Sequence, residues 1–70
     1  MITMDKVEKL FNKLKVFAKN AKNMNTLRFV VHESKIRVKK YKNAVSAAKL
    51  QQYYDAVIEI VNKRMRELKQ

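Results

Sequence analysis

The sequence predicts an α+β fold in which a helix, a β-hairpin and a longer helix follow one another, with both helices packed on one face of the hairpin. Three observations favour this class. Apolar residues recur at helical spacing in both end segments. The segment between them, TLRFVVHESKIRVKKY, is rich in β-branched and aromatic residues, which favour strands. Three asparagines separate this segment from the first helix. A chain of 70 residues is long enough for one domain, 1–70, with one apolar core.

The first helix is predicted over residues 4–22. Thr3 can cap its N-terminus, and Asp5 in its first turn interacts favourably with the helix dipole. One stripe at helical spacing is expected to be buried and consists of Val7, Leu10, Phe11, Leu14, Phe17, Ala18 and Ala21. Lysines run along the opposite face, so we expect that face to be basic from end to end.

A longer helix is predicted over residues 44–68, with Asn43 or Ser46 as its N-cap. Its apolar stripe consists of Ala47, Leu50, Tyr54, Val57, Ile58, Val61, Met65 and Leu68. Tyr53 and Ile60 widen this stripe beyond what one hairpin and one helix can cover. We therefore expect a homodimer whose interface buries Tyr53, Ile60 and Met65.

Residues 26–41 admit two interpretations, a β-hairpin and a middle helix. In a hairpin, Val31 lies opposite Ile36 and Phe29 lies opposite Val38, which gives one continuous apolar face. In a helix, Phe29 and Ile36 would face water, so the hairpin is favoured. The turn lacks the Asn-Gly or Asp-Gly pair of the tightest hairpins. An all-α three-helix bundle therefore stays open as the alternative.

The charge balance points to a polyanionic partner. The chain has 17 Lys and Arg against 6 Asp and Glu, a formal net charge of +11, and such a density attracts nucleic acid. In the hairpin, Arg28, Arg37 and Lys39 would share one sheet face with Tyr41, which could stack on an unpaired base. The predicted nucleic-acid contacts are Arg28, Lys35, Arg37, Lys39, Tyr41, Lys42, Arg64 and Arg66.

We accordingly expect a nucleic-acid-binding protein, or a small subunit of a ribonucleoprotein or RNA-processing assembly, that holds RNA or DNA mainly by its phosphates. The alternative is a protein-interaction module, an inhibitor or an assembly subunit, that binds an acidic protein surface. In the first case affinity falls steeply with salt. In the second, one partner saturates the protein and bulk polyanion binds poorly.

An enzyme is not expected. The chain has no glycine, which phosphate-cradling loops and nucleophile elbows require. His32 has no second histidine or cysteine to complete a metal site, and Asp55 and Glu59 lack a nearby nucleophile. We expect no cofactor and no metal. The absence of cysteine favours the cytoplasm, and no stretch approaches the ~20 apolar residues of a membrane span.

The predicted helix–hairpin–helix order, the basic hairpin and the run KLQQYYDAVIEIVNKRM at 49–65 resemble two families. One is the small Alu-binding proteins of the signal recognition particle, and the other is the smallest dimer-forming subunits of the KEOPS tRNA-modification assembly. The resemblance lies in element order and apolar spacing. It implies an RNA-associated subunit that dimerises, and it assigns no functional residue.

Overall fold

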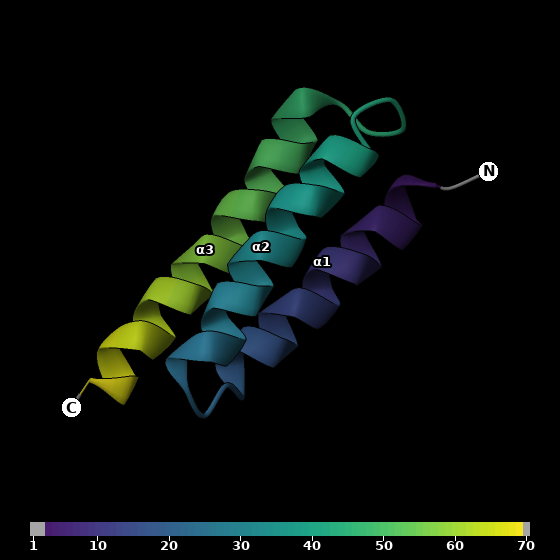
Figure 1. Ribbon diagram of the computed structural model, residues 1–70. Helices are drawn as coiled ribbons and strands as arrows, with labels where there is room; N and C mark the ends of the chain where they lie inside the picture. Colours follow the sequence, from purple (N-terminus) through teal and green to yellow (C-terminus); the bar gives the residue numbers. More distant parts are fainter. Residues whose placement is uncertain (1–2, 70) are drawn as a thin grey trace.

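The computed structural model describes residues 3–69, which form three α-helices joined by short loops (Figure 1). They are α1 (Met4–Lys19), α2 (Met24–Lys40) and α3 (Ala47–Leu68). Successive helices run in opposite directions, and α3 packs against both α1 and α2. The result is an elongated bundle of 42 × 18 × 16 Å.

The predicted α+β class is wrong, because the described residues contain no strand and the expected hairpin at 26–41 is helical. Leu27, Val30 and Ser34 are buried at the spacing of three and four that places them on one side of α2. The Ser34 hydroxyl donates a hydrogen bond of 2.8 Å to the Val30 carbonyl oxygen. A polar residue can therefore lie in the core, because its hydroxyl is paired within its own helix.

Phe29 and Ile36 face water, as the helical alternative requires. Their exposed fractions are 51 % and 42 %. Strand propensity describes how well a side chain fits a half-buried pleated surface, and tertiary packing can override it. Here the free energy gained by burying one stripe of α2 against two neighbouring helices exceeds the cost of leaving two apolar side chains exposed. The α-β-β-α order that suggested the two RNA-associated families is consequently absent from residues 3–69.

Each helix begins at a side-chain cap. Thr3, Asn23 and Ser46 accept hydrogen bonds from the backbone amides three residues further on, at 3.3, 2.9 and 3.3 Å. These caps satisfy amide groups that have no partner within the helix. The capping prediction for Thr3 is confirmed, and Ser46 rather than Asn43 caps the last helix. The outer helices are shorter at their loop ends than the predicted ranges 4–22 and 44–68.

The core lies along the line where the three helices meet. Its largest fully buried side chains are Phe11, Leu27 and Leu50, one from each helix. The Phe11 ring packs against the ring of Tyr53, with centroids 5.6 Å apart. Phe17, predicted to lie in the buried stripe of α1, is instead 58 % exposed. The predicted buried stripe of α1 therefore wrongly included Phe17.

Candidate nucleic-acid interface

Three basic residues line one side of α2. Arg28, Lys35 and Lys39 are separated by seven and four residues, so they lie on the same side of the helix, well away from its buried stripe. All three are exposed, and His32 is exposed on the same side between the first two. Neither of the two ion pairs in residues 3–69 involves them. We call Arg28, Lys35 and Lys39 the α2 basic face.

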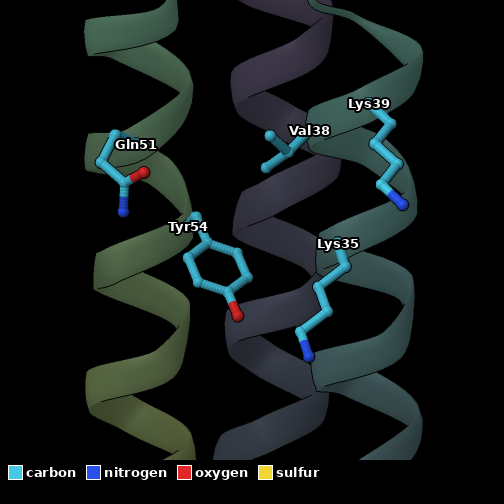
Figure 2. Close-up of a pocket in the computed structure, with 5 residues that line it drawn as sticks. All are labelled: Lys35, Val38, Lys39, Gln51 and Tyr54. Atoms are coloured by element: carbon cyan, nitrogen blue, oxygen red, sulfur yellow. The ribbon is translucent and has the colours of Figure 1, made fainter.

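A pocket of about 220 Å³ lies beside the α2 basic face, between α2 and α3 (Figure 2). Its lining is mainly apolar and consists of Lys35, Val38, Lys39, Gln51 and Tyr54. Figure 2 shows the Tyr54 ring projecting from α3 into the space between the helices, with Val38 facing it from α2. The Lys35 ammonium extends toward the phenol end of this ring, whereas Lys39 points away from α3.

The side chain of Gln51 is held at the wall of this pocket. Its Nε2 donates a hydrogen bond of 2.7 Å to Asp55 Oδ1, one helical turn further along α3. A carboxylate only accepts hydrogen bonds, so the amide nitrogen must face Asp55. The amide oxygen is then left without that partner and is directed toward α2 (Figure 2).

Arg37, predicted to share a face with Arg28 and Lys39, lies elsewhere. Nine residues correspond to two and a half helical turns, so Arg37 lies on the opposite side of α2 from Arg28. It is half-buried, and its Nη1 forms an ion pair of 2.8 Å with Glu33 Oε2 and lies 3.4 Å from the Glu33 carbonyl oxygen. The prediction that Arg28, Arg37 and Lys39 share one face is therefore wrong, because it depended on strand alternation.

Tyr41 ends α2 and is buried, with 9 % of its surface exposed. Its amide donates to the Arg37 carbonyl oxygen at 3.0 Å, and the Lys40 Nζ lies 5.5 Å from the centre of its ring. Burial in the core and a cation on the ring leave little surface on which a base could stack. Lys42 follows in the loop and is exposed near the end of α2 that carries Lys39.

The two predicted arginines of α3 occupy different surroundings. Arg64 Nε donates a hydrogen bond of 2.7 Å to the Ala21 carbonyl oxygen, and its Nη1 pairs with Glu67 Oε1 at 3.3 Å. Arg64 therefore ties α3 to the loop after α1. Arg66 is exposed near the C-terminal end of α3. Neither arginine lies beside the pocket that adjoins the α2 basic face.

The predicted dimer residues do not form one patch. Tyr53 and Ile60 are seven residues apart on the side of α3 that faces α1, whereas Met65 lies about a third of a turn or more away around the helix. All three are partly buried against the core of their own chain. A homodimer through these residues stays a prediction.

The surroundings of Tyr53 also change its acidity. Burial of the phenol, and to a lesser extent the negative charges of Glu8 and Asp5 on α1, raise the pKa of Tyr53 above its ordinary value of 10.0. Burial and negative charge both disfavour the phenolate. Tyr53 is therefore a neutral packing residue of the α1–α3 contact.

Gln51 and Tyr54 were not among the predicted site residues. The sequence pattern placed Tyr54 in the buried stripe of the last helix, and the structure half-buries it at the pocket. The spacing of seven and four between Arg28, Lys35 and Lys39 was visible in the sequence, and it would have indicated the basic face had residues 26–41 been interpreted as a helix.

Within residues 3–69, no three His, Cys, Asp or Glu side chains lie close enough to hold a metal ion. None of the three helices described has an apolar stretch long enough to cross a membrane. No protein-family model matches the chain, and no curated protein or solved structure matches it.

Proposed function

We propose that this protein is a non-enzymatic nucleic-acid-binding protein that holds phosphate groups on the α2 basic face. The observation that carries the proposal is the alignment of Arg28, Lys35 and Lys39 on one exposed side of a helix, outside the ion pairs formed within residues 3–69, in a chain of net charge +11. A cytoplasmic location is part of the same proposal and is supported by a sequence without cysteine.

The spacing of the three cations suits separate phosphates. A rise of ~1.5 Å per residue sets Arg28 and Lys35 about 10 Å apart along the helix axis, and Lys35 and Lys39 about 6 Å apart. Successive phosphates of one strand in a duplex are ~3.4 Å apart along its axis. Each cation can therefore neutralise a different phosphate, and the release of condensed counterions supplies the affinity. These contacts carry no base specificity, so RNA and DNA both fit.

The test replaces Arg28, Lys35 and Lys39 together with glutamine. Binding to a duplex and to a single-stranded oligonucleotide is measured by fluorescence anisotropy over a range of salt concentrations. We expect weaker binding, and a slope of log affinity against log salt that is smaller by about 2 to 3, because each lost phosphate contact removes ~0.7 to 0.9.

The matched control is the triple glutamine variant of Lys6, Lys13 and Lys19, which are exposed on α1 and carry the same total charge. It should weaken binding much less, because it alters only the overall field. Equal losses in both triple variants would show that diffuse charge alone attracts the nucleic acid, and the proposed site on α2 would be abandoned.

A second candidate function, binding to an acidic protein surface, is favoured by a separate observation. Five large apolar side chains are exposed on α1 and α2, namely Met4, Val16, Phe17, Phe29 and Ile36. Phe29 and Ile36 lie on the solvent-facing side of α2, away from the pocket with α3. Lys13 lines one surface hollow together with Val16 and Phe17. This part of the exposed apolar surface would suit an amphipathic helix with acidic side chains.

A pull-down from native lysate, with and without nuclease, separates the two candidates. If the first holds, nuclease removes the captured partners, and so does the glutamine triple on α2. The second candidate function predicts a partner that is still captured after nuclease treatment and by the glutamine triple variant. The double variant Phe17→Ser, Phe29→Ser should no longer capture this partner. Phe17 and Phe29 are more than half exposed, so this double variant should still fold.

A further inference from the structure

We infer that the pocket between α2 and α3 binds a nucleobase, so that the ligand of the α2 basic face is single-stranded nucleic acid with unpaired bases. This inference rests on the proposed function and adds to it the class of nucleic acid. Tyr54 supplies the ring on which the base stacks, Lys35 holds the adjoining phosphate, and Gln51 contacts the edge of the base. Lys39, which points away from α3, holds a phosphate further along the strand.

The size and lining of the pocket suit one planar ring. Its volume of about 220 Å³ is smaller than the ~300–1,000 Å³ of sites for drug-sized ligands. The lining is mainly apolar, with the half-buried Tyr54 ring on one side and Val38 on the other. Stacking on an aromatic ring is the usual way in which proteins hold an unpaired base, because every base has a π face.

The charged residues at the pocket favour a ligand that carries an anionic group next to its ring. Lys35 and Lys39 both line the pocket, and no acidic residue does. The Lys35 ammonium lies toward the phenol end of the Tyr54 ring (Figure 2). A ligand that inserts an aromatic ring between Tyr54 and Val38 thus places its attached groups beside the Lys35 ammonium, and a nucleotide has an anionic phosphate next to its base.

Gln51 gives the pocket a hydrogen-bond acceptor at its exposed wall. Asp55 holds the amide nitrogen at 2.7 Å, which leaves the amide oxygen directed toward α2. That oxygen can accept a hydrogen bond from an amino or imino N–H on the edge of a base. These base edges are occupied in a duplex and free in a single strand, so the pocket favours unpaired bases.

The experiment compares the same protein with three probes of equal length and charge. They are a cytidine oligonucleotide, an abasic oligonucleotide that keeps every phosphate, and an oligo-glutamate. Binding is measured for the wild-type chain, for Tyr54→Leu and for Tyr54→Phe, and circular dichroism verifies that each variant is folded. Leucine keeps an apolar side chain at position 54, whereas phenylalanine keeps the ring.

We expect wild-type protein to bind the cytidine probe about 5- to 150-fold more tightly than the abasic probe, the range expected for stacking of one base. Tyr54→Leu should remove this preference, and Tyr54→Phe should largely keep it. The salt slope should stay unchanged in both variants, because no phosphate contact is lost. Binding of the abasic probe and of duplex DNA should also stay unchanged.

The inference about the base fails if wild-type protein binds the cytidine and abasic probes equally, or if Tyr54→Leu weakens binding to both by the same factor. The proposed function survives that result, provided that the glutamine triple on α2 still reduces the salt slope. Oligo-glutamate bound as tightly as the cytidine probe, with the same dependence on Tyr54, would overturn the base site in favour of an acidic protein ligand. Failure to bind any nucleic acid would overturn both proposals.

Discussion

The three phenylalanines of this chain have the same side chain but different surroundings. Phe11 is fully buried and packs on Tyr53, while Phe17 and Phe29 are 58 % and 51 % exposed. Removal of a buried ring leaves a cavity and forfeits its contacts, whereas removal of an exposed ring loses little. The contribution of each phenylalanine to stability therefore depends on the helix face on which it lies.

Phe11→Ala should lower the free energy of unfolding by about 3–5 kcal/mol, enough to unfold so small a domain. Phe29→Ala should change it by only about 0.5 kcal/mol, as expected for a surface substitution. Urea and thermal denaturation followed by circular dichroism measure both. Loss of the cooperative transition in Phe29→Ala would contradict the helical position of this residue and favour the hairpin.

Tyr53 should make stability fall at alkaline pH. The pKa of its phenol is raised in the folded chain, mainly by burial and further by Glu8 and Asp5. The folded state therefore holds the proton more tightly than the unfolded state, whose pKa is near 10.0. The stabilising contribution is complete below that pH and is lost as the pH rises through the folded-state pKa.

The substitution Tyr53→Phe should remove this part of the alkaline loss. Denaturation midpoints measured below and above pH 10 should fall more steeply for the wild-type chain than for the variant. All other titratable groups are common to the two proteins, so their effect cancels in the comparison. If the denaturation midpoints of the wild-type chain and of Tyr53→Phe fell equally with pH, burial would not raise the pKa of the Tyr53 phenol.

At the scale of helices, α3 carries most of the links that hold the bundle together. It packs against both other helices, and Arg64 joins it to the loop after α1 through the Ala21 carbonyl oxygen. Such a contact between residues far apart in the sequence orders the end of one helix against another. Arg66, two residues further along, is exposed and makes no comparable link.

Arg64→Gln should therefore reduce the free energy of unfolding by roughly 1–3 kcal/mol, because it removes a hydrogen bond from a charged donor to a backbone carbonyl. Arg66→Gln removes the same charge and should leave stability nearly unchanged. Thermal melts of the two variants, measured side by side, provide the comparison. If both variants melt at the same temperature, the contact with Ala21 contributes nothing measurable to stability.

The molecule as a whole carries far more cationic side chains than carboxylates, 17 against 6. Two of them form ion pairs in the described residues, with Arg37 and Arg64, and most lysines face solvent. Like charges so close together repel one another and destabilise the compact state. The excess of positive charge does not stabilise the fold, and it is what the proposed binding of a polyanion would require.

Sodium chloride should consequently raise the melting temperature, since ~1 M salt shortens the screening length to about 3 Å. The glutamine triple at Arg28, Lys35 and Lys39 should melt higher than the wild-type chain at low salt, and the difference should shrink at high salt. Scanning calorimetry measures both effects. A melting temperature independent of salt would show that repulsion is too weak to affect the fold.

The net charge, the two outer helices and the cap at Thr3 could all be predicted from the amino-acid sequence. These features depend on composition, on long stripes at helical spacing and on local hydrogen bonds, so they need no knowledge of distant contacts. The same local signals placed Phe17 in the core, because a sequence stripe does not show how much of a helix its neighbours cover.

The conformation of residues 26–41, and with it the candidate site, depends on packing against the other two helices. Phe29 and Val31 satisfy the period of a strand, while Leu27 and Val30 satisfy that of a helix, so the local pattern fits both. Burial of the second pair against α1 and α3 selects the helix. In the helix, Lys35 lies beside Tyr54, which is 19 positions away along the chain, and Tyr41 lies in the core. The reason is that the period of the backbone determines which side chains share a surface.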